Sequence, residues 1–267
     1  MNNLLGIYEK ALPPLSWKES FALAKEAGYD FIELSVDIRR LNKLDYTDRQ
    51  IEEIRGCART YGMSLETMTL SANRYFPIGD IEKREQGMDI IRKAIVLASK
   101  LGVKLIQLAA YDVYRRPSTP ESRALYEEGI REVLRFDEDY GITLAIEVLE
   151  DVEHFNTSAK LIPFIRKIGH PLLKEYADTG NLVYNGFDPI SDLKDGISET
   201  AAIHIKDAIY HNEHNIGYGE GLVDFDKAFA FLKEADYKGY LVSECWYEEN
   251  YTPDIGKINR FIRSKML

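Results

Sequence analysis

The chain has little of what would tie it to a membrane, to nucleic acid or to a disulfide framework. Only two of its 267 residues are cysteines, Cys57 and Cys245, which is too few for a disulfide framework or a cysteine zinc site. No apolar run approaches the roughly 20 residues of a membrane span, and the amino terminus turns polar too early for a signal peptide. The formal net charge of −10 argues against nucleic acid and anionic membranes as partners. We therefore expect a cytoplasmic protein in a reducing compartment.

The glycine-rich signatures of nucleotide-binding folds are also missing. No GxGxxG follows the first apolar strand, and no P-loop occurs anywhere in the chain. No linker rich in Pro, Gly or Ser and no low-complexity segment interrupts the sequence. A length of 267 residues with 45% hydrophobic residues suits one α/β barrel. We expect one domain spanning residues 1–267.

The sequence does contain a recurring unit, in which an amphipathic helix ends in a turn and an apolar strand follows. Glycine suits the end of such a helix, and a strand that is apolar on both faces suits a parallel sheet. The pattern predicts strands at residues 4–8, 30–36, 64–70, 103–109, 142–148, 173–178, 200–206 and 239–245. It predicts helices at residues 16–27, 47–61, 82–101, 121–140, 158–168, 188–198, 225–235 and 254–265. Eight such units predict a (β/α)8 TIM barrel, with a doubly wound open sheet as the alternative.

Four consecutive predicted strands carry a polar side chain near the carboxyl end, where TIM barrels place catalytic groups. These residues are Glu147, Asp178, His204 and Glu244. Taken singly, each has an ordinary explanation, such as a paired strand glutamate, an Asx turn or a core histidine. Together, three carboxylates and one imidazole suit Mn²⁺, Mg²⁺, Co²⁺ or Zn²⁺, and carboxylates packed together need a cation. The joint pattern favours one divalent metal site.

With these residues the chain resembles the L-ribulose-5-phosphate 3-epimerases, also called L-xylulose-5-phosphate 3-epimerases or, in older usage, hexulose-6-phosphate isomerases, of the xylose isomerase-like TIM barrel superfamily. The matching stretches include GIYEKALP, AAYDVY, YADTGNL, AAIHIKD and the SECW around Glu244, and they cover nearly the whole chain. The resemblance implies that Glu147, Asp178, His204 and Glu244 bind the metal. It also implies that Glu147 and Glu244 move the proton, and that the protein is a homodimer acting on a sugar phosphate.

The implied reaction is metal-dependent epimerisation at C3 of a ketopentose 5-phosphate through a cis-enediolate. The two glutamates would serve as base and acid on opposite faces of the sugar. Aldose–ketose isomerisation, or epimerisation of a free ketose, on the same site is the first alternative. A sugar-phosphate sensor without enzymatic activity is a second. A DNA-repair endonuclease on this barrel would need a histidine-rich zinc cluster and a basic face, which the sequence lacks.

Several further residues are candidates for substrate contacts, each with a plain structural alternative. Loop residues after the strands are Asn73, Glu153, Asn156 and Asn181, and the aromatic candidates for the pocket wall are Tyr8 and Trp246. Close relatives carry an arginine before the GEG segment, which here reads HNEHNIGYGEG. Phosphate contacts are therefore expected from Lys206, with His211 or His214 as alternatives, and from the backbone of Gly219 and Gly221.

Overall fold

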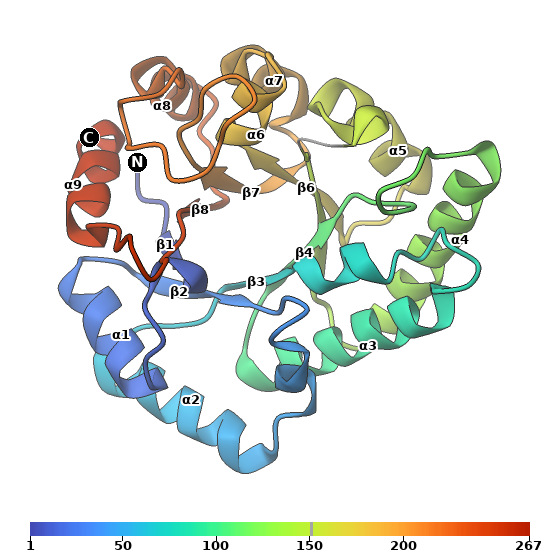
Figure 1. Ribbon diagram of the computed structural model, residues 1–267, viewed down its shortest axis with the longest axis horizontal. Helices are drawn as coiled ribbons and strands as arrows, with labels where there is room; N and C mark the ends of the chain where they lie inside the picture. Colours follow the sequence, from blue (N-terminus) through green and yellow to red (C-terminus); the bar gives the residue numbers. More distant parts are fainter. Residues whose placement is uncertain (150–151) are drawn as a thin grey trace.

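The computed structural model, which describes residues 1–149 and 152–267, is a closed barrel of eight parallel strands inside a ring of helices (Figure 1). The strands pair in chain order, and β1 also pairs with β8 to close the barrel. They are β1 (Leu5–Tyr8), β2 (Phe31–Ser35), β3 (Thr67–Leu70), β4 (Leu105–Ala109), β5 (Thr143–Glu147), β6 (Leu173–Asp178), β7 (Thr200–Ile205) and β8 (Tyr240–Ser243).

The helices of the outer ring begin and end at residues suited to those positions. Ser16, Thr47 and Thr119 form capping boxes, while Gly62 and Gly102 end their helices in the left-handed conformation that glycine adopts without strain. The helices are α1 (Trp17–Glu26), α2 (Asp48–Tyr61), α3 (Arg84–Leu101), α4 (Pro120–Asp137), α5 (Ser158–Ile168), α6 (Thr179–Tyr184), α7 (Pro189–Gly196), α8 (Phe225–Glu234) and α9 (Ile255–Met266). Short 3₁₀ turns are η1 (Glu9–Ala11), η2 (Leu41–Asp45), η3 (Ser71–Tyr75) and η4 (Glu153–Phe155).

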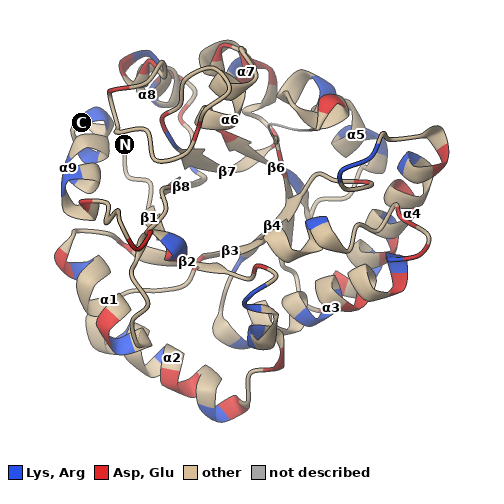
Figure 2. Cartoon of the chain, viewed as in Figure 1, with Lys and Arg blue, Asp and Glu red and all other residues tan. Residues whose placement is uncertain are grey.

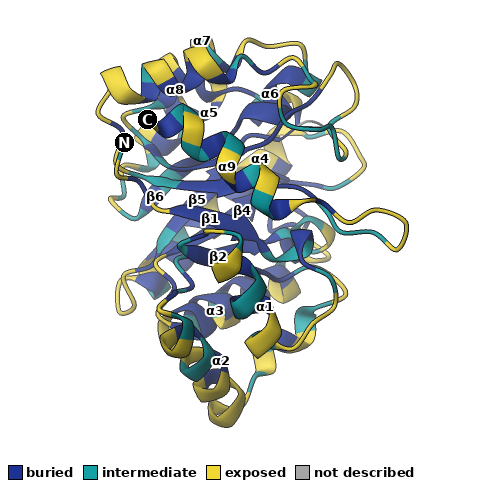
Figure 3. Ribbon diagram, turned by 90° about the vertical axis from the view of Figure 1, so that its left-hand side faces the viewer, coloured by how far each residue is buried: buried dark blue, intermediate teal, exposed yellow. Residues whose placement is uncertain are grey.

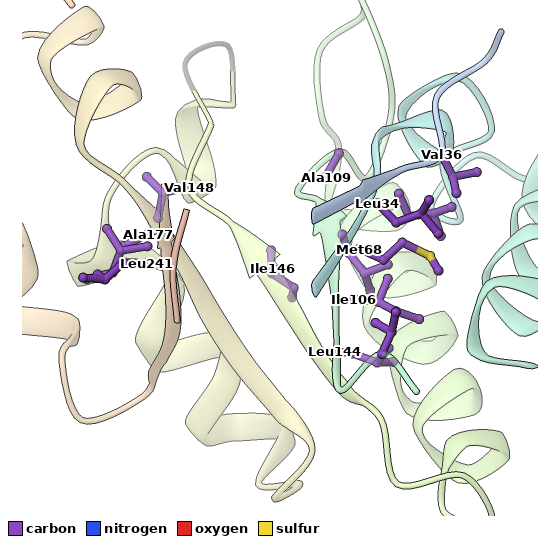
Figure 4. Close-up of a cluster of buried hydrophobic side chains, with 14 of the residues drawn as sticks. Leu34, Val36, Met68, Ile106, Ala109, Leu144, Ile146, Val148, Ala177 and Leu241 are labelled. Carbon is purple, nitrogen blue, oxygen red and sulfur yellow. The ribbon is translucent and has the colours of Figure 1, made fainter. Parts of the chain in front are cut away.

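Side chains alternate between the two faces of each strand, which separates two kinds of core. One face packs against the helices in a large apolar cluster that includes Leu34, Met68, Ile106 and Ile146 (Figure 4). Their neighbours in sequence point into the barrel, where small clusters form around Tyr176 and around Tyr8, Phe31 and Val242. The strands are buried while exposed residues lie on the outer helices and loops (Figure 3). The interior face is therefore the one that can carry polar groups to the mouth of the barrel.

The predicted TIM barrel is confirmed, and each predicted strand is present within a few residues of its expected bounds. The sequence did not predict α6, which begins directly after Asp178 at a Thr-Gly-Asn segment that is typical of a turn. Within the part of the chain that the structure describes, no helix is long and apolar enough to cross a membrane. The division into one domain stays a prediction.

Candidate active site

The four predicted metal ligands come together at the carboxyl end of the barrel. Pairing of β5 with β6 and of β6 with β7 sets Asp178 opposite His204 and Glu147 opposite Tyr176. One donor atom from each of Glu147, Asp178, His204 and Glu244 lies within 4.8 Å of the others, and all four residues are buried. The two glutamates enter from β5 and from the end of β8, so they flank the pair formed by β6 and β7.

His204 lies at the centre of this group. Its Nδ1 atom is 2.9 Å from Oε1 of Glu147 and 3.6 Å from carboxylate oxygens of both Asp178 and Glu244. Nδ1 is therefore the ring nitrogen that faces the other three donors. A metal ligand at this nitrogen must be unprotonated, so the proton of a neutral imidazole has to reside on Nε2.

Glu33 holds that other nitrogen, and sequence reasoning missed it. It lies in β2, is fully buried, and its Oε2 atom is 2.8 Å from Nε2 of His204. Its Oε1 atom accepts hydrogen bonds from the hydroxyls of Thr67 and Tyr176, at 2.7 and 2.8 Å. A glutamate at the middle of the apolar run FIELS was the only available signal, because such a side chain needs a buried partner. The contact fixes both the ring plane and the tautomer of His204.

Asp178 uses its two oxygens differently. Oδ1 accepts the backbone N–H of Asn181 at 2.8 Å and so caps the amino terminus of α6. Oδ2 of Asp178 and Oε2 of Glu244 are buried and form no hydrogen bond among the described residues, although Nζ of Lys206 is 3.1 Å from each. Buried carboxylate oxygens without hydrogen bonds next to an oriented imidazole nitrogen fit a divalent ion with oxygen and nitrogen ligands.

The electrostatics of the group show how closely the charges are packed. Burial raises the pKa of Glu147 to about 7, against the opposing effect of the hydrogen bond with His204. Burial by itself would raise the pKa of Asp178, but the charge of Lys206 and the contact with His204 lower it. Burial would lower the pKa of His204, but the charges of Glu244 and Glu33 raise it well above its usual value. Positive charge is therefore required wherever these carboxylates are ionised.

A cavity of about 770 Å³ opens above the four donors, and three of them, Glu147, His204 and Glu244, line it. Of the predicted substrate contacts it is lined by Tyr8, Asn181, Lys206 and Trp246. The Lys206 ammonium lies 5.2 Å from the ring centroid of Trp246 and 2.7 Å from Oδ1 of Asn181, and it also pairs with Glu213. Gln107, also in the lining, donates to Oε2 of Glu147 at 2.5 Å and so fixes that carboxylate.

Other predicted contacts lie elsewhere. Both polar atoms of the Asn73 side chain bond to the backbone of Ala109, and Asn73 is not in the cavity lining. Glu153 lines a second cavity over the loops after β4 and β5, and Asn156 accepts from Lys160.

The backbone N–H groups of Gly219 and Gly221, which were expected to bind phosphate, are also engaged. Both donate to Oδ2 of Asp207, at 2.8 and 2.9 Å. Neither glycine lines the cavity above the four donors. Asp207 therefore takes the place in this loop that an anionic ligand would need.

Comparison with known proteins gives one consistent result. Residues 21–265 match the family model described as xylose isomerase-like TIM barrel. The L-ribulose-5-phosphate 3-epimerases UlaE of Salmonella heidelberg (strain SL476) and Salmonella paratyphi C (strain RKS4594) are 36% and 37% identical, over 98% of this chain and 94% of theirs. A solved L-ribulose 3-epimerase aligns with a TM-score of 0.81 at 19% identity, covering 98% of this chain and 92% of the other.

Proposed function

The chain belongs to the xylose isomerase-like TIM barrel family and is an epimerase similar to the L-ribulose-5-phosphate 3-epimerases, and we propose that it inverts C3 of a ketopentose 5-phosphate. The substrates would be L-ribulose 5-phosphate and L-xylulose 5-phosphate, which differ at that carbon. The observation that carries the proposal is the buried group of Glu147, Asp178, His204 and Glu244 beside a cavity of about 770 Å³. A cytoplasmic homodimer with a single domain is part of the proposal.

The reaction begins with removal of a proton from C3, next to the C2 carbonyl. The negative charge that develops moves onto O2, and the product is a cis-enediolate with the O3 hydroxyl beside that oxygen. A bound divalent ion (Mn²⁺, Zn²⁺, Co²⁺ or Mg²⁺) would supply the positive charge that stabilises these oxygens. Glu147, Asp178, Glu244 and Nδ1 of His204 would hold that ion.

Inversion requires a base on one face of C3 and an acid on the other. Glu147 and Glu244 approach the same point from β5 and β8, so one carboxylate takes the proton and the other returns one to the opposite face. Gln107 donates to Oε2 of Glu147 and so restrains that carboxylate, which fixes the direction of attack. The two glutamates exchange roles when the reaction runs in reverse.

The remaining polar groups in the cavity position the sugar. The Lys206 ammonium lies between Asp178 and Glu244, where it can donate to a substrate hydroxyl next to the reacting carbon. Tyr8 and Trp246 form apolar walls, and Asn181 is held by a hydrogen bond to the carbonyl of Val148.

The test is exchange of the C3 hydrogen with D₂O, followed by proton NMR on both 5-phosphates. The wild-type protein should exchange and epimerise, and Glu147→Gln and Glu244→Gln should each slow epimerisation by about 10²-fold or more. Glu66→Gln is the matched control, because Glu66 accepts from the Tyr240 hydroxyl near the opposite end of the barrel. Undiminished exchange in both site variants would refute the two-carboxylate mechanism.

The same assay separates the alternatives. Formation of an aldose would show isomerisation, and faster turnover of free ketoses would show that phosphate is dispensable. Adding back Mn²⁺, Zn²⁺, Co²⁺ or Mg²⁺ to metal-free protein identifies the ion. Binding of the 5-phosphates without exchange under any metal would favour a sensor.

A further inference from the structure

The cavity above the four donors has two ends of opposite charge, and we propose that its cationic end, formed by Lys10, Arg39 and Arg74, is a phosphate subsite. The proposal deepens the proposed function and rests on it, since it assigns the 5-phosphate of the substrate to this end. It concerns residues that the sequence did not single out for phosphate.

All three cations come from the turns that follow the first three strands. Lys10 lies in η1 after β1, Arg39 in the loop after β2, and Arg74 in η3 after β3, and each lines the cavity. Figure 2 shows blue segments on these turns, beside the centre of the barrel. The acidic donors come from β5 to β8, so the two charged groups occupy opposite arcs of the barrel mouth.

Among the described residues, the carboxylates paired at the turns after β1 and β2 are fewer than the cations they serve. Asp37 lies 3.1 Å from Nζ of Lys10 and 2.6 Å from Nη1 of Arg40, so one carboxylate serves two cations. Glu9, a second acid of this rim, is neutralised by the buried Lys43. Such an end attracts a dianion, while the acidic end attracts a cation.

Tyr8 spans the space between the two ends. Its ring centroid lies 6.1 Å from that of His204, and Nζ of Lys10 lies 5.5 Å from the same ring. The His204 ring and the Lys10 ammonium therefore lie no more than about 12 Å apart, with Tyr8 between them. A short ketose whose O2 and O3 lie over the four donors can lay its carbon chain along Tyr8 with its terminal phosphate near Lys10.

Arginine is well suited to this role because its planar guanidinium can donate two hydrogen bonds to one phosphate. The guanidinium of Arg74 lies over the ring of Tyr111, 5.6 Å from its centroid, which restricts where it can point. Arg39 is exposed at the entrance. The groups first expected to bind phosphate are less suited to it. Three carboxylates, those of Asp178, Glu213 and Glu244, lie against Lys206 and would repel a dianion, and the N–H groups of Gly219 and Gly221 donate to Asp207.

The test measures phosphate binding separately from catalysis. Inorganic phosphate is titrated calorimetrically into the Mg²⁺-loaded wild-type protein and into Arg39→Gln, Arg74→Gln and Arg49→Gln. Arg49 is an exposed arginine on the outer helix α2 and serves as the matched control. The dissociation constant should rise about 10- to 100-fold in Arg39→Gln and in Arg74→Gln, and stay at the wild-type value in Arg49→Gln.

A second readout is the selectivity for phosphorylated sugar. The ratio of kcat/KM for L-ribulose 5-phosphate to that for free L-ribulose should fall by a similar factor in both site variants. Wild-type phosphate affinity in both variants, or no binding to the wild type, would refute the subsite. The wild type could also turn over no ketose and still bind phosphate, with that binding weakened in both variants. In that case the proposed reaction fails and the subsite stands.

Discussion

Replacing Glu33 with glutamine should weaken metal binding although Glu33 is not itself one of the four donors. In the wild type, Oε2 of Glu33 accepts from Nε2 of His204 at 2.8 Å, so that in the neutral ring, the form that binds a metal, Nδ1 is bare toward the other ligands. In Glu33→Gln the new carbonyl can still accept from Thr67 and Tyr176, as Oε1 does now. The amide NH₂ would then face Nε2, which can pair with it only by giving up its proton.

The magnitude follows from the tautomer. A proton moved to Nδ1 occupies the nitrogen that lies 2.9 Å from Glu147 and 3.6 Å from Asp178 and Glu244, so the ring cannot ligate until it rearranges. Loss of such a carboxylate–histidine contact lowers metal affinity about 10- to 100-fold, or roughly 1.4–2.7 kcal/mol.

The assay is calorimetric titration of Mn²⁺ into protein freed of metal by chelation. Glu66→Gln again provides the control, since it removes a glutamate that accepts from a tyrosine hydroxyl away from the site. Wild-type Mn²⁺ affinity in Glu33→Gln, together with a lowered melting temperature, would refute the reasoning and leave Glu33 a purely structural residue.

Three further outcomes are expected. Burial raises the pKa of Glu175 to about 7 from about 4.5 in the unfolded chain, so its contribution to stability is complete below pH 4.5 and is lost as the pH rises through 7. The free energy of unfolding of Glu175→Gln, measured in urea against that of the wild type, should therefore rise by up to about 3 kcal/mol between pH 4 and pH 8. Parallel pH profiles of the two proteins would contradict this. Gly221→Ala would drive its Cβ into Asp207 and the carbonyl of Ala208, lowering stability by about 1–3 kcal/mol while phosphate affinity stays unchanged; a loss of that affinity would restore Gly221 as a phosphate ligand. Chelation should lower the melting temperature, since an ion present at 100 times its Kd stabilises by about 2.7 kcal/mol, and an unchanged transition with all four metals would argue against the site.

The barrel and the four donors could be predicted from the sequence because both depend on local patterns. Helix ends, apolar strands and polar strand ends can each be recognised within about a dozen residues. The alternation of eight strands and helices along the chain then predicts the barrel. Glu147, Asp178, His204 and Glu244 stand out because each interrupts or ends an apolar run at the same relative position.

The rest depended on contacts between distant strands. Glu33 is 171 residues from His204 in the chain, and nothing in FIELS says which strand its side chain meets. Asn73 looked available for a sugar, but its amide is used by the backbone of a neighbouring strand. The glycines of GYGEG fold around Asp207, which lies 12 and 14 residues before Gly219 and Gly221 in the chain.

The contact between Glu33 and His204 has a consequence for how the barrel could be divided. Every expected metal ligand belongs to the second half of the chain, which by itself would carry a full set of donors. The residue that orients His204 belongs to the first half, as does Thr67 behind it. A fragment containing only β5 to β8 would therefore hold the ligands without the alignment, and the two halves would have to associate before tight metal binding returned. Metal affinity thus becomes a reporter of whether both halves of this barrel have closed on one another.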